Sequence, residues 1–249
     1  MARLSVNVNK IATLRNTRTI GIPSLTQLSA LALSSGAHGI TVHPRPDQRH
    51  IRSEDVEQIA AVVARYPGAE YNIEGNPFHG LLEHCERVRP AQATLVPDAR
   101  EAFTSNHGWN LVELGAVERK ALGRAVESLH ASGCRVSLFI DPIPEMMPIA
   151  RELRADRVEL YTEPYAAAAA SGNATASLAT YALAGKAARE QGLGVNAGHD
   201  LNLSNLRAFL QAGSGVDEVS IGHALIADAL EFGLKETVRR YLAECGEAS

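Results

Sequence analysis

Eight short apolar runs recur along the chain, and stretches with a helical pattern of apolar residues lie between them. Strands that alternate with helices favour a parallel sheet, because each helix carries the chain back to the edge where the previous strand began. The same alternation argues against a β-sandwich or a helical bundle. We expect strands at Leu4–Val8, Gly39–Val42, Glu70–Ile73, Ala93–Val96, Arg135–Ile140, Arg157–Leu160, Gly194–Asn196 and Glu218–Ile221.

Several of the intervening stretches begin with a residue that can cap a helix. Ser53 precedes two acidic residues, and Ser204 precedes residues 205–211, so oxygens stand where the first amides of a helix need partners. An Ala-rich run at residues 166–170 is interpreted as a helix end followed by a loop. The longer helices are expected at Leu25–Ser34, Ser53–Arg65, Leu114–Ala131, Thr175–Gln191 and Ala224–Glu244.

The length of the chain fits one closed fold. A (β/α)8 barrel typically needs about 250 residues, and this chain has 249, with no Pro/Gly/Ser-rich linker to divide it. Its content of 45% hydrophobic and 21% charged residues can supply a large core. We therefore expect an α/β protein, a (β/α)8 TIM barrel with extra helices, in which residues 1–249 form a single domain.

Charge and cysteine content limit the partners. A formal net charge of −4 and a pI of about 6.1 argue against a general nucleic-acid binder. No stretch resembles a signal peptide or a membrane span, so no membrane partner is expected. Cys85, Cys134 and Cys245 lack metal-ligand spacing and are expected to be ordinary apolar residues. These features predict a cytoplasmic protein that acts on small molecules.

Polar residues follow the expected strands at the point where each strand ends. In a barrel of this kind the loops after the strands surround one mouth, so these side chains should converge there. Three histidines and two glutamates at one rim suit catalysis better than any one of them alone, since a single such histidine is more often structural. The residues are Asn7, Asn9, His43, Glu74, Asp141, Glu159, His199, Gly222 and His223.

A cationic segment follows the second expected strand. His43, Arg45, Arg49 and His50 lie within eight residues of one another. Arginine offers a planar fork of donors to phosphate, and histidine titrates near neutral pH, so the segment could bind an anion and move protons. Lys10, Arg15 and Arg18 follow the first strand and would add donors to the same mouth. A solvated charged loop is the alternative for both segments.

Two further features bear on chemistry. Apolar neighbours of Glu74 could desolvate its carboxylate and raise its pKa towards that of a useful base, although a turn or a helix cap explains it equally well. Gly222 and His223 follow the eighth strand, where barrels often hold phosphate on backbone amides and a helix start. No dinucleotide or nucleoside triphosphate motif is present, and no H-x-H or H-E-x-x-H pair suggests a catalytic metal.

Ordered motifs extend across nearly the whole chain. They are V-N-V-N-K-I-A-T-L-R-N-T-R from Val6, G-I-T-V-H-P-R-P-D-Q-R-H from Gly39, N-I-E from Asn72, L-V-P-D from Leu95, V-S-L-F-I-D from Val136, V-N-A-G-H-D-L from Val195 and I-G-H-A-L-I from Ile221. Together these motifs resemble the pyridoxine 5'-phosphate synthase family, the ring-closing enzymes of the deoxyxylulose-phosphate-dependent vitamin B6 pathway.

The resemblance implies a barrel enzyme that condenses 3-amino-2-oxopropyl phosphate with 1-deoxy-D-xylulose 5-phosphate to give pyridoxine 5'-phosphate, phosphate and water. It implies no metal or organic cofactor, and a homo-oligomer of eight subunits. His43 and Glu74 match proton acceptors, His199 matches a proton donor, and Glu159 matches a carboxylate that stabilises a transition state. Asn7, Arg18, Asp200, Gly222 and His223 match the site of the amino-ketone and product phosphate, and Arg45, His50 and Thr104 that of the deoxyxylulose phosphate.

The chain departs from the family pattern at a few positions. Asn9 and Lys10 stand where many members carry Asp-His, and Asp200 and Glu163 stand where glycine is common. We hypothesise that Lys10 supplies a positive charge to a substrate phosphate or hydroxyl. Two other functions stay open: a different phosphosugar barrel such as an isomerase or aldolase, and a phosphate-ligand binding barrel without catalysis. The stretch 97–109 is a candidate lid over the mouth.

Overall fold

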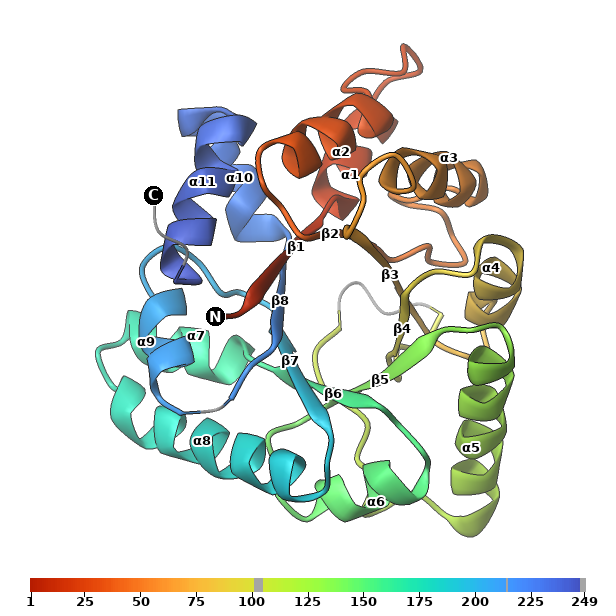
Figure 1. The fold of residues 1–249 in the computed structure, drawn as a ribbon, viewed down its shortest axis with the longest axis vertical. Coiled ribbons are helices and arrows are strands. Elements are labelled where there is room, and N and C mark those ends of the chain that lie inside the picture. The colour runs from red at the N-terminus through yellow and green to blue at the C-terminus, as the bar shows by residue number, and fades with distance from the viewer. Residues whose placement is uncertain (101–104, 214, 247–249) are drawn as a thin grey trace.

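Eight parallel strands close into a barrel, as the alternating pattern predicts. The computed structural model describes residues 1–100, 105–213 and 215–246. Each strand pairs with the next, and β8 pairs with β1. Figure 1 shows the ring of strands with the helices around its outside. The strands are β1 (Arg3–Asn7), β2 (Gly39–Val42), β3 (Glu70–Gly75), β4 (Gln92–Leu95), β5 (Arg135–Ile140), β6 (Arg157–Tyr161), β7 (Gly194–Gly198) and β8 (Glu218–Ile221).

The predicted (β/α)8 barrel with extra helices is therefore confirmed. All eight strands lie where they were expected, with ends that shift by one or two residues. No helix among the described residues has both the length and the apolar character needed to cross a membrane. The helices are α1 (Asn9–Asn16), α2 (Leu25–Ser34), α3 (Ser53–Val63), α4 (Leu81–Val88), α5 (Ala116–Ala131), α6 (Met146–Glu152), α7 (Glu163–Ala170), α8 (Ala174–Glu190), α9 (Leu206–Gln211), α10 (His223–Phe232) and α11 (Leu234–Glu244).

The prediction of one long helix at Ala224–Glu244 is wrong. Gly233 has φ 76° and ψ 146°, a conformation outside the helical region, and it separates α10 from α11. A solvated charged loop was the alternative for the segment after β1, but α1 begins there at Asn9. The Ala-rich run was interpreted correctly, since it forms the end of α7 and a turn at residues 171–173 follows.

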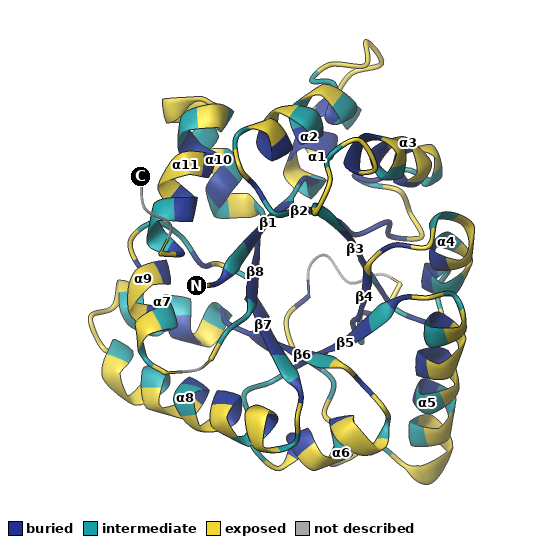
Figure 2. Ribbon diagram, in the orientation of Figure 1, coloured by how far each residue is buried: buried dark blue, intermediate teal, exposed yellow. Residues whose placement is uncertain are grey.

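Alternation within the strands sorts the side chains into two layers. In β1, Leu4 and Val6 are buried among the core residues that the outer helices cover, and Ser5 faces the barrel interior. Ser5 Oγ lies 2.7 Å from Thr41 Oγ1, and Thr94 on β4 bonds across the interior to Glu159 on β6. The interior is therefore a polar network, whereas most of the apolar core lies between the barrel and its helices. Figure 2 shows buried positions on the strands and on parts of the surrounding helices.

Candidate active site

A cavity of about 500 Å³ opens at the carboxyl ends of the strands. Its walls come from residues that end or follow β1 to β8, so distant parts of the sequence meet there. The mouth expected from the positions after the strands is thus present. Among the candidate residues, those that line the cavity are Asn7, Asn9, Lys10, His43, Arg45, Arg49, His50, Glu74, Glu159, His199, Asp200, Gly222 and His223.

Two glutamates lie deep in this cavity. The Glu74 side chain is 13% exposed, and it accepts bonds from Asn7 Nδ2 at 3.4 Å and Ser220 Oγ at 3.5 Å. Burial raises the pKa of Glu74 to about 7, against an opposing effect of the nearby His199. Burial and the nearby Glu74 carboxyl raise the pKa of Glu159 well above its usual range. Near neutral pH, Glu74 can therefore take up or release a proton, while burial favours the protonated form of Glu159.

Two histidines of the cationic segment are held neutral. Burial and the charge of Arg45 lower the pKa of His43 well below its usual value, and the same two effects, in that order, lower the pKa of His50 to about 4. The backbone amide of Ile51 donates to His50 Nδ1 at 2.9 Å, which leaves the ring proton of His50 on Nε2. His43 Nδ1 lies 3.9 Å from Glu74 Oε2. A neutral His43 beside Glu74 suits the acceptance of a proton.

Asn9 braces the loop that carries His43. Its Oδ1 accepts the backbone amide of His43 at 2.9 Å, and its own backbone amide donates to Asn7 Oδ1 at 3.0 Å. Asn7 in turn donates to Glu74, so a chain of hydrogen bonds links β1 to both candidate bases. Asn9, which was predicted only as a ligand contact, therefore also supports the loop that carries His43.

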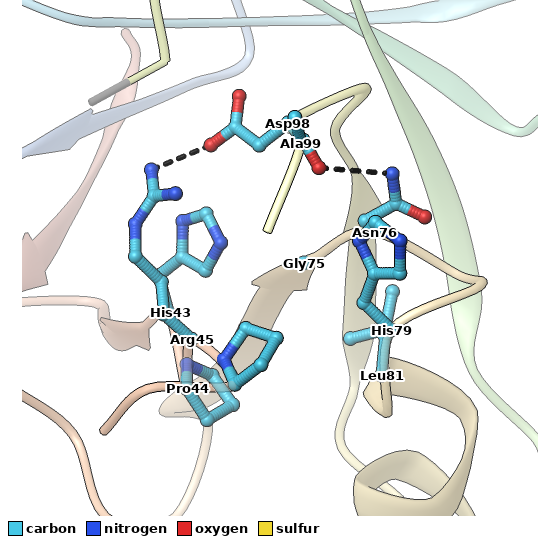
Figure 3. A pocket seen from close by; sticks show the side chains of 10 residues that line it. His43, Pro44, Arg45, Gly75, Asn76, His79, Leu81, Asp98 and Ala99 are labelled. Carbon is cyan, nitrogen blue, oxygen red and sulfur yellow. Dashed lines mark hydrogen bonds and ion pairs between the residues drawn. The ribbon is translucent and has the colours of Figure 1, made fainter. Parts of the chain in front are cut away.

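Arg45 is engaged by an acidic residue that sequence reasoning did not select. Its guanidinium lies 2.5 Å from Asp98 Oδ2, and both side chains are buried. Figure 3 shows this pair together with the bond from Asn76 to the Asp98 backbone oxygen. Ser105 Oγ also donates to Asp98 Oδ2 at 2.7 Å. Asp98 therefore ties the segment after β4 to the arginine, although its motif, L-V-P-D, gave no sign of that contact.

The start of α10 forms another part of the wall. Gly222 is the residue before the helix, and His223 is its first residue. A side chain at Gly222 would press on Asn7, since an added Cβ would lie 3.2 Å from its side-chain atoms. The glycine thus permits the helix start to approach β1, and the helix presents unpaired amides and a positive dipole end at the cavity.

Phe139 lines an apolar side of the cavity, and Tyr161 packs against it. Their rings meet edge to face with centroids 5.6 Å apart, and the centroids of the Tyr161 and His199 rings are 5.1 Å apart. Together with Val96 they form a small cluster of their own beside the polar groups. Sequence reasoning missed them because an aromatic residue within a strand is read as ordinary core.

Some expected members do not line the cavity. Arg15 was expected to add a donor to the mouth, and this is wrong: its guanidinium is buried and paired with Asp55 Oδ1 at 2.5 Å, between α1 and α3. Arg18 is exposed beyond the end of α1 and is not among the lining residues. Thr104 lies outside the described residues, as does part of the candidate lid. Asp141 instead accepts the backbone amide of Gly108 at 3.1 Å.

Within residues 1–100, 105–213 and 215–246, no group of three or more His, Cys, Asp or Glu side chains is arranged to hold a metal ion.

Comparison with known proteins identifies relatives over nearly the full chain. A family model described as pyridoxal phosphate biosynthesis protein PdxJ matches residues 4–247. A pyridoxine 5'-phosphate synthase from Albidiferax ferrireducens is 54% identical over 245 residues, 96% of each chain. One from Xanthomonas oryzae pv. oryzae is 51% identical over 247 residues, 96% of this chain and 95% of the relative.

Similar solved structures agree on the fold alone. A tryptophan synthase chain from M. tuberculosis aligns with a TM-score of 0.65 at 13% identity, over 98% of this chain and 92% of that one. Thiamine phosphate pyrophosphorylase from Pyrococcus furiosus aligns with a TM-score of 0.60 at 13% identity, over 98% and 94% of the two chains. Both support the barrel architecture, and neither bears on the chemistry.

Proposed function

Because the chain belongs to the pyridoxal phosphate biosynthesis protein PdxJ family and is an enzyme of that family, we propose that it forms pyridoxine 5'-phosphate. In this reaction 3-amino-2-oxopropyl phosphate condenses with 1-deoxy-D-xylulose 5-phosphate, and phosphate and water leave as the pyridine ring closes. The observation that carries the proposal is the pairing of Glu74, whose pKa is about 7, with a neutral His43 at 3.9 Å in one cavity.

Acid and base groups supply the proton transfers that ring closure requires. Addition of an amine to a ketone, loss of water, loss of phosphate and aromatisation each need a proton taken or given. We assign proton acceptance to Glu74 and His43 and proton donation to His199. Glu159, whose protonated form is favoured by burial, stabilises charge that develops on a substrate oxygen by donating a hydrogen bond.

Two anchors for phosphate would hold the two substrates against each other. The first is the start of α10 with Gly222, His223 and Asn7, which suits the amino-ketone phosphate because helix amides and a positive dipole end favour an anion. The second is formed by Arg45 and by Nε2–H of His50, which suits the deoxyxylulose phosphate. Holding both ends makes ring closure effectively intramolecular. Arg18, Asp200 and Thr104 stay predicted contacts of these anchors.

Lys10 is assigned to the second anchor. It lines the same cavity, and it is close enough to the neutral His50 to lower the pKa of that ring. A lysine is a point charge on a flexible stem, so it can follow a phosphate or hydroxyl that a shorter histidine would have to meet at a fixed place.

A direct assay tests the proposal. Purified protein is mixed with both substrates without added metal, and pyridoxine 5'-phosphate and phosphate are followed by mass spectrometry and phosphate assay. Equimolar products that disappear in His43→Ala support the synthase. Conversion of one phosphosugar alone would indicate an isomerase or aldolase instead. Tight binding of a substrate without any product would indicate a binding barrel.

We also propose a cytoplasmic location and an assembly of several copies. All three cysteines are buried and none forms a disulfide, as is usual in a reducing compartment such as the cytoplasm. Several large apolar side chains are exposed, and Ile22 at 62% and Leu230 at 80% suit contact with further copies of the chain. Light scattering that gives eight times the chain mass of 26.6 kDa would support an octamer, and a mass of one chain would exclude it.

A further inference from the structure

Two consecutive residues at the cavity adopt a backbone conformation that side chains rarely accept. His199 has φ 93° and Asp200 has φ 59°, and neither is glycine. Hydrogen bonds hold the chain on both sides of this turn. Thr162 Oγ1 lies 2.6 Å from the backbone oxygens of Gly198 and His199. Asn205 Nδ2 donates to the backbone oxygen of Asp200 at 3.3 Å. Strain that the surroundings enforce in this way is typical of functional sites.

The strained turn brings the two side chains together. His199 Nδ1 lies 3.2 Å from Asp200 Oδ2, and both residues line the cavity. An ionised carboxylate can only accept hydrogen bonds, so the proton of this contact sits on Nδ1. The bond from His199 lowers the pKa of Asp200, with smaller contributions from His223 and Lys10, which keeps the carboxylate ionised near neutral pH.

Asp200 is chemically unsuited to hold a substrate phosphate with its side chain. A carboxylate repels a phosphate dianion and offers it no proton. Its position beside the phosphate anchor therefore needs another explanation. The Tyr161 ring on β6, whose centroid lies 5.1 Å from that of the imidazole, and the Glu74 carboxyl on β3 also lie near His199. The Asp200 carboxylate accepts the hydrogen bond of His199 Nδ1.

We propose that Asp200 is a positioning residue: its carboxylate fixes the ring of His199 and keeps a proton on Nδ1, so that Nε2 takes up a proton released by the substrate in one step and donates it to the substrate in a later one. This inference rests on the proposed function for the identity of the reaction. It assigns to Asp200 a role through His199 and leaves only its backbone for contact with phosphate. A carboxylate that orients a catalytic imidazole in this manner is a recurrent device in enzymes.

Three variants test the proposal by kinetics. Asp200→Gly removes the acceptor and also relieves the positive φ, so it should fold at least as well as the wild type. Its kcat should fall about tenfold to 100-fold, the usual loss when the partner that orients a functional histidine is removed. KM for the amino-ketone phosphate should stay level or fall, because a negative charge has left the cavity. Asp200→Asn keeps an acceptor and tolerates the turn, so its kcat should fall less.

Arg154→Gly is the matched control. Arg154 also has a positive φ, 64°, but it is exposed near the end of α6, and it does not line the cavity. Both glycine variants should match or exceed the wild type in thermal stability, and only Asp200→Gly should lose kcat. A kcat within twofold of the wild type in Asp200→Gly, or a loss confined to KM, would overturn the proposal.

A measurement without substrate separates this inference from the proposed reaction. In protein labelled with ¹⁵N-histidine, the ring nitrogens of His199, identified by comparison with His199→Gln, report which nitrogen carries the proton. The neutral ring should carry it on Nδ1 in the wild type and become a mixture in Asp200→Gly. If the wild type makes no pyridoxine 5'-phosphate but the proton moves as expected, the reaction is wrong and the positioning role stands. If the proton position is the same in the wild type and in Asp200→Gly, the positioning role is wrong, whatever the reaction.

Discussion

Strand β3 carries a glutamate at each end of the barrel, and the two behave in opposite ways. Glu70 begins the strand at the amino-terminal floor, and Glu74 lies at the cavity. Burial pushes the pKa of both upwards, but the hydrogen bond and charge of Arg135, together with Arg3, bring the pKa of Glu70 below its usual value. The pKa of Glu74 rises to about 7. The arginine partners of Glu70 and the deeper burial of Glu74, whose side chain is 13% exposed against 23% for Glu70, together decide the difference.

The comparison separates stability from chemistry along one polar interior. At the floor, Arg135 lies 2.5 Å from Glu70 and Arg3 lies 3.2 Å from it, so charge is neutralised in the ground state. At the mouth, Glu74 is bonded to the neutral groups of Asn7 and Ser220. A carboxyl left with neutral partners keeps a proton that it can exchange, which is what a catalytic base needs.

Loss of the mouth carboxylate should have the largest effect. Glu74→Gln keeps the size and the two hydrogen bonds but cannot take a proton, so kcat should fall by about 10²-fold to 10⁴-fold, the usual contribution of a general base. Initial rates of pyridoxine 5'-phosphate formation measure it, with circular dichroism to show an intact fold. Glu70→Gln is the control and should keep kcat within about twofold. Equal losses in both variants would erase the distinction between floor and mouth.

The pH dependence of stability should have opposite signs at the two positions. The pKa of Glu74 is raised, so the folded state retains a proton that the unfolded state has lost between about pH 4.5 and 7. Its contribution to stability is therefore lost as pH rises through this window. As pH rises from 4.5 to 8, the free energy of unfolding of Glu74→Gln should increase by about 2 to 3 kcal/mol relative to that of the wild type.

For Glu70 the pKa is lowered, so its contribution is present above the unfolded value of 4.5 and is lost as pH falls through the lower folded value. The advantage of the wild type over Glu70→Gln should therefore shrink on acidification. Urea unfolding of the three proteins at several pH values gives both trends. A difference between wild type and Glu74→Gln that does not vary with pH would contradict the raised pKa.

At neutral pH, Glu70→Gln should lower the free energy of unfolding by about 1 to 2 kcal/mol, because it weakens charge-assisted bonds that are only partly exposed. Glu190→Gln is a matched control on the surface. Its partner Lys186 lies 3.9 Å away, and both side chains are more than half exposed, so the change should stay within about 0.5 kcal/mol. Urea midpoints decide between them. A floor variant as mild as the surface control would mean that its ion pairs contribute no stability.

The barrel was predictable because it depends on repetition. Leu4 and Val6 on β1, like the apolar residues of the other strands, indicate a buried segment without any knowledge of their three-dimensional contacts. Where a boundary depended on one residue, prediction was weaker: Gly233 lies within an otherwise helical pattern, and only its backbone conformation shows that two helices meet there. Short helices such as α4 bury too few residues to give a clear periodic signal, since Leu81 and Cys85 are its only fully buried members.

The site was predictable in its location and less so in its contacts. Strand ends converge in any barrel, so His43 and Glu74 could be placed at one mouth from their positions in the sequence. The partner of each cation could not. Arg15 and Arg45 look alike in the sequence, yet Arg15 is paired with Asp55 away from the cavity and Arg45 with Asp98 beside it. Pairing depends on three-dimensional neighbours that periodicity does not encode.

Lys10 extends the comparison from carboxylates to cations and should give the smallest effect. Arg135 at the floor is held by two glutamates, whereas Lys10 at the mouth forms no ion pair that the structure records among its described residues and lines the cavity. If it serves the substrate, Lys10→Met should raise KM for 1-deoxy-D-xylulose 5-phosphate by about threefold to tenfold, the effect of one partly solvated charge. The kcat should change by less than about twofold, and the rise in KM should shrink with added salt.

Lys186→Met is the control. It removes a charge on exposed α8, away from the residues that line the cavity, and should leave KM unchanged. Unchanged affinity for both substrates in Lys10→Met would mean that Lys10 contributes no more to substrate binding than Lys186 does.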